Sequence, residues 1–451
     1  MSQLPSTPDK GSTPVRFGPV ELAPGVLPRH VTSFIVAALI AISLTIFVNM
    51  LQPYVLTENL RLPSSTHGRI SSGLVVMQET IALLLVGFLG AWSDRVGRRN
   101  VFAGGMLLIS CGLLAYPLCT TLPQLVASRI VVALGAACTA ATLAGIAADL
   151  PRNNSRGRLL SILMFTQQVG IVVLVAYTGA KLPQFMRSVG FDAIEAGRAA
   201  FWVVGFVGLL GALVAFRGLS PPQRHGSGDV ARVIGFGGVV GDLRQVFGEA
   251  RRNPRLALVF PVAIVARGDA MIVSAFLSLW IVTAARAQGV ETADALARAG
   301  TALGVFTISA VAATIGAGFL IDRMDRAKAA TWAALAAGLA YVAAGLVGDV
   351  MGPGMLVLAV ALGLTEAALI IAGQALLGEQ APEARRGATV GAFGFCGSLG
   401  VLVITIFAGQ LFDRWTHAGP FILVGLVNLA VFAWAWLIRH RVAFPAGVHN
   451  G

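Results

Sequence analysis

The chain has 451 residues, a formal net charge of +12 at pH 7, 56% hydrophobic residues and 12% charged residues. A soluble domain carries about 25% charged residues, so this composition excludes an ordinary soluble enzyme or binding domain. The basic residues lie in short stretches between long apolar runs, which indicates membrane topology and not a nucleic-acid-binding face. We therefore expect a lipid bilayer, and no nucleic acid, around this chain.

The first 30 residues are polar and rich in Pro, Ser and Gly. They lack the basic–apolar–small order of a cleavable signal peptide. The composition predicts a disordered cytoplasmic tail over residues 1–30. The first apolar run would then act as an uncleaved anchor.

Twelve apolar segments follow, and each is long enough to cross a hydrocarbon core of about 30 Å as a tilted helix. The sequence therefore predicts an all-α membrane protein with about 12 transmembrane helices in two six-helix bundles, residues 31–217 and 255–440. The segments are 32–56, 71–92, 100–120, 123–148, 158–180, 199–217, 255–284, 301–321, 328–348, 353–378, 388–412 and 418–438.

Residues 218–254 form the longest connection, and residues 441–451 form a C-terminal cytoplasmic tail. In the linker, Leu243, Val246 and Phe247 share one helical face. This pattern predicts a short helix on the cytoplasmic membrane surface, with a plain linker as the alternative. With the N-terminus inside, 23 of the 33 Lys and Arg residues fall on the inner side. Both termini are therefore predicted to be cytoplasmic, in a multi-pass protein of a bacterial inner membrane.

A charged turn interrupts the apolar pattern after the second segment and recurs in the second half of the chain. Its members are Gly90, Asp94, Arg95, Gly97 and Arg98. Two clusters repeat at offsets of about 228–230: Gly90, Asp94, Arg95 and Arg98 as Gly318, Asp322, Arg323 and Arg326, and Asp149, Arg156 and Gly157 as Glu379, Arg386 and Gly387. Two clusters at nearly one offset indicate a duplicated six-helix unit.

The sequence resembles the major facilitator superfamily of secondary transporters over essentially its whole length. The run from Gly90 to Arg99 is similar to the signature of that family between helices 2 and 3. The run from Ser128 to Thr139, with Arg129 followed by Gly135, is similar to its helix 4 motif. The resemblance implies alternating access, in which two halves rock about a midplane cavity lined chiefly by helices 1, 4, 7 and 10.

The repeated charges are expected to form conformational latches. Helix 11 begins near Gly387, so its partly positive N-terminus would favour Asp94 beside it when the cytoplasmic side closes. We expect Arg98 to pair with Asp149 and, by duplication, Arg326 to pair with Glu379. If these charges only fixed the orientation of the helices in the membrane, that role would explain the arginines but not Asp94 or Gly97.

Three ionisable residues lie near the centres of helix 7 (residues 255–284) and helix 10 (residues 353–378). Each requires a structural or functional explanation, because a charge at the bilayer centre is energetically costly. Arg267 and Asp269 are two positions apart, about 200° around a helix, so they cannot share a face unless Gly268 breaks it. Asp269 and Glu366 are proton-coupling candidates, and the alternative is a static ion pair with Arg267. Arg267 is also a candidate for the substrate cavity.

The first bundle adds further candidates. Glu79 shares a helical stripe with Gly90, so it is a gate or coupling candidate. Arg129 would bind an anionic group of the substrate or, as the family pattern favours, neutralise a nearby carboxylate. Gln167 and Gln374 are substrate-cavity candidates, each with an interhelical hydrogen bond as the plainer interpretation.

Several kinds of site are absent from the sequence. It contains no phosphate-binding loop and no Cys/His cluster, and its four cysteines lie in apolar runs, so we predict no ATP site, no metal and no cofactor. The predicted function is proton-coupled transport of a small organic solute by a monomer that is not an enzyme, with the proton gradient as energy source. One alternative is an uncoupled facilitator or organic-anion carrier in which the intramembrane charges are static ion pairs. Another, from a different class, is a non-transporting membrane sensor.

Overall fold

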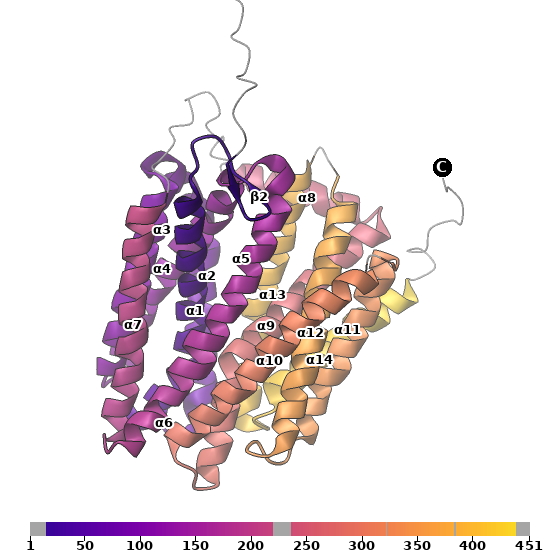
Figure 1. Cartoon of the computed structure of the whole chain (residues 1–451). Helices are drawn as coiled ribbons and strands as arrows, with labels where there is room; N and C mark the ends of the chain where they lie inside the picture. The colour runs from indigo at the N-terminus through magenta and orange to yellow at the C-terminus, as the bar shows by residue number, and fades with distance from the viewer. Residues whose placement is uncertain (1–14, 220–235, 322, 383–384, 439–451) are drawn as a thin grey trace, which may run out of the picture.

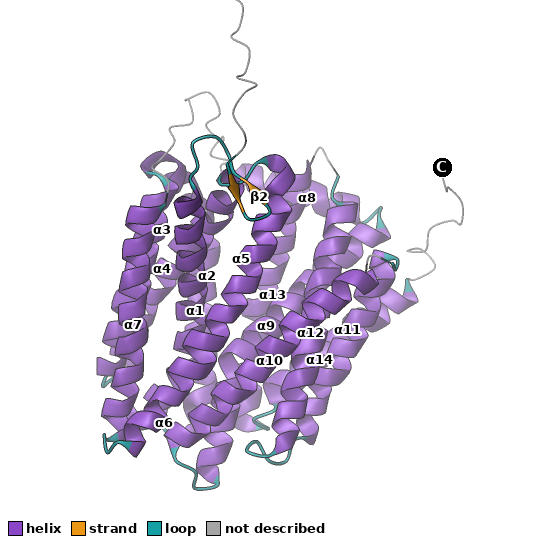
Figure 2. Ribbon diagram, in the orientation of Figure 1, coloured by secondary structure: helices purple, strands orange, loops and turns teal. Residues whose placement is uncertain are grey.

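The structure of the chain, a computed structural model, describes residues 15–219, 236–321, 323–382 and 385–438. Figure 2 shows an almost entirely helical molecule whose strands are confined to one small hairpin. Within the described ranges, 12 helical spans are long and apolar enough to cross a membrane. This confirms the predicted all-α class with two six-helix bundles.

The first bundle contains six spans, of which the fifth combines α5, a π-helical segment and α6. Its helices are α1 (Pro28–Tyr54), α2 (His67–Val96), α3 (Arg98–Ala115), α4 (Leu122–Asp149), α5 (Arg156–Gly170), the π-helical segment (Ile171–Gly179), α6 (Ala180–Ser188) and α7 (Ala193–Gly218). Most of the helices are longer than the apolar runs that predicted them. An apolar run corresponds only to the part of a helix inside the hydrocarbon core, and the backbone stays helical into the polar interface.

The second bundle repeats this order after a linking helix, α8. These helices are α8 (Phe236–Ala250), α9 (Pro254–Ala287), α10 (Thr292–Ile321), α11 (Arg326–Val342), α12 (Pro353–Gln380), α13 (Arg386–Arg414) and α14 (Gly419–Leu437). The apolar face of α8 packs on the second bundle: Val246 is buried, and the Phe247 ring lies 5.0 Å from that of Phe260 between centroids. The predicted helix is thus present, but its apolar face covers protein.

The N-terminal segment differs from the expected disordered tail. Strands β1 (Arg16–Phe17) and β2 (Val20–Glu21) form a hairpin, and α1 begins at Pro28. The segment docks on the loop after α4, where Ala23 N donates to Leu150 O at 2.9 Å. The prediction failed for residues 15–30 because this pairing is with a distant loop, which local composition does not reveal. Residues 1–14 and 439–451 lie outside the described ranges.

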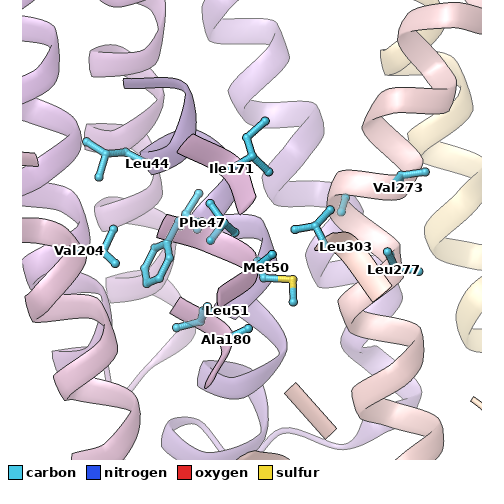
Figure 3. Close-up of a cluster of buried hydrophobic side chains, with 14 of the residues drawn as sticks. Leu44, Phe47, Met50, Leu51, Ile171, Ala180, Val204, Val273, Leu277 and Leu303 are labelled. Atoms are coloured by element: carbon cyan, nitrogen blue, oxygen red, sulfur yellow. The ribbon is translucent and has the colours of Figure 1, made fainter. Parts of the chain in front are cut away.

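The two bundles lie side by side in Figure 1, and helices of one bundle contact helices of the other: α2 with α13, α1 with α9, and the fifth span with α10. We call the face where α1 begins and α14 ends the terminal side, and the opposite face the far side. Figure 3 shows apolar side chains of α1 with Val204 of α7 on one side and residues of the second bundle on the other. The labelled residues include Phe47, Met50, Ile171, Leu277 and Leu303.

Close helix contacts between the bundles are concentrated on the far side. A Cβ added at Gly409 of α13 would lie 2.1 Å from Ser72 Oγ of α2, and one at Gly300 of α10 would lie 2.4 Å from Ala176 O. At the terminal ends of the same helices, Gly90 and Gly391 face open space. The structure is therefore closed between its bundles on the far side and separated on the terminal side.

Candidate functional site

A cluster of polar residues lies inside the second bundle, on four helices. Asp269 of α9 accepts hydrogen bonds from Asn428 Nδ2 of α14 at 2.9 and 3.1 Å, and it is fully buried. Glu366 of α12 accepts from the Tyr341 hydroxyl of α11 at 2.8 Å and is 7% exposed. Asp269 and Glu366 lie on α9 and α12, which contact each other. We call these four residues the carboxylate cluster.

The carboxylate cluster contains no cation. Across the described residues, neither Asp269 nor Glu366 forms an ion pair. The alternative of a static pair with Arg267 is therefore wrong. The reason is rotational: α9 is continuous from Pro254 to Ala287, so Arg267 and Asp269 leave it on nearly opposite sides.

Arg267 pairs instead with the other bundle. Its Nη2 lies 3.0 Å from Oε1 of Glu79 on α2. The Glu79 side chain is 8% exposed and that of Arg267 is 48% exposed. The stem of Arg267 lies against Gly397 of α13, where an added Cβ would be 2.4 Å from Arg267 Cδ. This ion pair joins the two bundles between the close far-side contact at Ser72 of α2 and the open terminal-side position at Gly90.

Arg129 of α4 lies in a second interbundle network. Its Nη2 donates to Asn49 Oδ1 of α1, and Asn49 Nδ2 donates to Ser274 Oγ of α9 at 3.0 Å. Arg129 is fully buried, and its Nε and Nη1 have no partner among the described residues. Its partner is thus an amide, and the expectation that it neutralises a nearby carboxylate is wrong.

We expect Asn49→Leu to destabilise the far-side contact. The change removes the acceptor for a buried guanidinium and the donor to Ser274, a loss of about 1–3 kcal/mol. Thermal unfolding of the purified protein would show a lower midpoint. Thr45→Val is the matched control, because the Thr45 hydroxyl bonds only within its own helix. An unchanged midpoint in Asn49→Leu would contradict the network.

The two glutamine candidates are not brought together with these charges. The Gln167 side chain on α5 is half-buried and the Gln374 side chain on α12 is exposed. Neither makes a hydrogen bond within the described ranges, so the plainer interpretation, an interhelical bond, is wrong for both in this state. They remain candidates for contact with a solute.

In the charged turn after α2, Arg98 forms the predicted ion pair with Asp149. Arg98 Nε lies 2.9 Å from Asp94 Oδ1, and Arg98 Nη1 lies 2.7 Å from Asp149 Oδ2. Gly97 ends α2 with φ of 102°, a conformation that favours glycine. Arg95 is exposed. The Asp94 side chain is 47% exposed and bonds only to Arg98 among the described residues, so its expected place at the start of α13 is not occupied in this state.

The second copy of the turn differs from the first. Arg326 Nη1 lies 3.4 Å from Glu379 Oε2, the expected pair, and Arg255 joins both Asp325 at 2.6 Å and Glu379 at 3.2 Å. Asp325 caps α11 by accepting from Lys328 N at 3.0 Å. Burial raises the pKa of Asp325, but the Lys328 hydrogen bond and the Arg255 guanidinium together hold that pKa below its usual value. Asp322 lies outside the described residues.

We expect Asp149→Asn to change the stability of this state by less than about 1 kcal/mol, because ion pairs of half-exposed side chains contribute little. The side chains of Arg98 and Asp149 are 33% and 48% exposed. Thermal unfolding of the variant beside the parent protein checks this. A large loss of stability would show that the pair holds the bundle together and is not a latch.

The sequence reasoning missed Asn428, Tyr341, Asn49 and Arg255. Asn428 is a lone amide in an apolar run, which is a usable signal in a membrane span. Nothing in the sequence distinguishes Arg255 from the neighbouring arginines that mark the predicted cytoplasmic side.

Comparisons with known proteins show the family of the chain and its fold. The family model described as Major Facilitator Superfamily matches residues 33–354 and 259–449. Magnetosome protein MamH of Paramagnetospirillum magneticum (strain ATCC 700264 / AMB-1) is 26% identical over 428 residues, which are 93% of this chain and 94% of that protein. Citrate exporter 1 of Aspergillus niger is 28% identical over 152 residues, which are 32% of this chain and 27% of that protein.

A solved structure shares the fold. The crystal structure of the nucleoside transporter NupG superimposes with a TM-score of 0.68 at 13% identity, covering 92% of this chain and 99% of that one. A likeness at this identity concerns the fold alone. With the family model spanning nearly the whole chain, the two six-helix bundles and the repeated turn, the chain belongs to the Major Facilitator Superfamily and is a membrane transporter, not an enzyme.

Proposed function

We propose that this transporter moves a small organic solute by alternating access and couples that movement to protons through Asp269 and Glu366. Solute transport needs no cofactor in this account, since the proton gradient supplies the energy. The structure is the state open on the terminal side, with the far side closed.

The observation that carries the proposal is the buried carboxylate cluster without a cation. A carboxylate removed from water is costly when ionised and unpaired, and two neighbouring ones oppose each other further. Asn428 and Tyr341 supply hydrogen bonds but no charge. At least one of the two acids is therefore neutral while the cluster stays buried, and it can release its proton when water reaches it.

Helix α9 links this cluster to the gate. Arg267 and Asp269 are two residues apart, on opposite sides of one continuous helix. When α9 moves relative to α2, the Arg267–Glu79 pair at the interface breaks, and the surroundings of Asp269 change with the same motion. Proton release and gate movement are thereby coupled through one rigid element.

We infer that the terminal side faces the cytoplasm, because most Lys and Arg residues outside the spans lie on it. The structure is then the inward-open state of a multi-pass protein with both termini cytoplasmic. We place the protein in a bacterial inner membrane as a monomer. The name of MamH suggests a magnetosome membrane as a second location.

A second candidate function is an uncoupled organic-anion carrier. Half-exposed Arg267 and the partial match to a citrate exporter favour an anionic solute. Arg129 adds a buried guanidinium with two unpartnered nitrogens. In this alternative the solute carries the charge, and no proton is needed.

Reconstituted protein distinguishes the two functions. A thermal-shift screen of organic acids, sugars and nucleosides first identifies a solute, with citrate as the first probe. Uptake of that solute is then measured in proteoliposomes with a pH gradient and with no gradient. Accumulation above equilibrium only with the gradient supports coupling, whereas equilibration at the same rate in both supports the carrier.

A further inference from the structure

The sequence contains a third copy of the Gly-x-x-x-Asp-Arg pattern, at the end of α13. The first copy is Gly90-Ala-Trp-Ser-Asp94-Arg95 at the end of α2, and the third is Gly409-Gln-Leu-Phe-Asp413-Arg414. Because α2 and α13 run antiparallel against each other, these copies lie at opposite membrane faces, Asp94 on the terminal side and Asp413 on the far side.

Asp413 caps the N-terminus of α2 across the interface between bundles. Its Oδ1 accepts from Gly68 N at 2.7 Å, and its Oδ2 accepts from Arg69 N at 2.9 Å and from Arg69 Nε at 3.2 Å. The Asp413 side chain is 1% exposed. The first N–H groups of a helix have no partner within it and carry partial positive charge, so a buried carboxylate there satisfies both needs.

Glycines allow the approach that this cap requires. A Cβ added at Gly68 would lie 2.6 Å from Asp413 Oδ1 and 2.7 Å from Gly409 O. A Cβ at Gly409 would lie 2.6 Å from Gly68 O. Gly409 and Asp413 are four residues apart and share a face of α13, as Gly90 and Asp94 share a face of α2.

The opposite end of the same helix pair shows the complementary arrangement. Asp94 is half-exposed, and Gly90 faces open space. From Gly68 to Asp94 and from Arg386 to Asp413 the helices rise about 40 Å each. Each Asp therefore lies level with the start of the other helix, although only the far-side cap is formed.

We propose that Asp413 is a far-side latch that alternates with Asp94: it caps α2 in the terminal-side-open state and is released when Asp94 caps α13. Asp413 is a positioning residue that acts on the balance between the two states and not on the solute. The inference rests on the alternating-access motion proposed above but not on proton coupling.

Double electron–electron resonance on the full-length protein in lipid nanodiscs tests it, without solute or gradient. Spin labels replace the exposed residues Val189 and Gly348 on the far side, and Gly157 and Gly387 on the terminal side, where side chains meet open space. The native cysteines Cys111, Cys119, Cys138 and Cys396 are replaced by Ala. The parent is expected to give a short far-side and a long terminal-side distance.

Asp413→Ala is expected to shift the ratio of the two states by about tenfold toward far-side-open, because it removes both the cap and the charge. Asp413→Asn keeps one acceptor and should give a smaller shift in the same direction. Arg69→Gln is the matched control: it removes only the half-exposed ion pair, so its shift should stay below about twofold. Adding Asp94→Asn to Asp413→Ala should partly restore the parent ratio.

Unchanged distances in both Asp413 variants would overturn the proposal, and so would an Arg69→Gln shift as large as that of Asp413→Ala. If Asp413→Ala does not fold, as judged by gel filtration, Asp413→Asn against Arg69→Gln gives the same decision. Since no proton gradient is applied in this experiment, a negative result would not argue against proton coupling. A failure of coupling in transport assays likewise leaves these populations unaffected.

Discussion

Asp269→Asn and Glu366→Gln will each reduce pH-gradient-driven accumulation of solute to the level of protein-free liposomes. Both changes keep the shape of the side chain and an oxygen that accepts from Asn428 or Tyr341, but neither amide can carry a proton. Equal-pH counterflow of the same solute is expected to persist, because exchange requires no net proton movement. Uptake of the solute identified by thermal shift, in proteoliposomes, measures both quantities.

The matched control for these variants is Asp349→Asn. Asp349 is an exposed carboxylate of the second bundle that bonds within its own loop. It should leave accumulation unchanged. If Asp269→Asn and Glu366→Gln both accumulated solute like the parent, the assignment of proton coupling to the carboxylate cluster would be wrong.

Arg267→Gln will stop transport and lower stability, because it leaves the Glu79 carboxylate 8% exposed without its cation. The expected cost is about 1–3 kcal/mol, that of an unsatisfied buried group, and below that of a fully buried pair because Arg267 is half-exposed. Thermal unfolding measures the stability, and equal-pH counterflow measures the transport.

A double-mutant cycle isolates the pair itself. In Glu79→Gln with Arg267→Gln no unpaired charge remains, so the double variant should be more stable than Arg267→Gln alone. Additive losses of stability would show that the two side chains do not interact, and would remove Arg267 and Glu79 from the gate.

The charged turn could be predicted from sequence because its contacts are local or duplicated. Arg98 reaches Asp94 within four residues, and the offset between Asp149 and Glu379 predicted the ion pair of Arg326 with Glu379. Helical rotation also correctly separated Arg267 from Asp269. Each of these inferences needs only the geometry of one helix or the comparison of two repeats.

The partners of the buried charges could not be predicted in the same way. Periodicity gives the direction in which a side chain leaves its helix, but not which helix lies there. The sequence therefore did not predict that Arg267 pairs with Glu79 of the other bundle. Nor did it predict that Arg129 donates to Asn49, where a carboxylate was expected. The N-terminal hairpin depends likewise on a loop more than 100 residues away.

Asp413 is an intermediate case. Its pattern was visible in the sequence, but the third copy does not follow the duplication offset, and its meaning depends on the antiparallel packing of α2 and α13.

Proton movement driven by the solute tests the central claim most directly. An outward solute gradient is imposed on proteoliposomes at equal pH, and a trapped dye reports the internal pH. The account predicts that the parent protein moves protons together with the solute, and that Asp269→Asn exchanges solute with no change in internal pH. Solute movement by the parent at constant internal pH, with the membrane potential clamped, would contradict it.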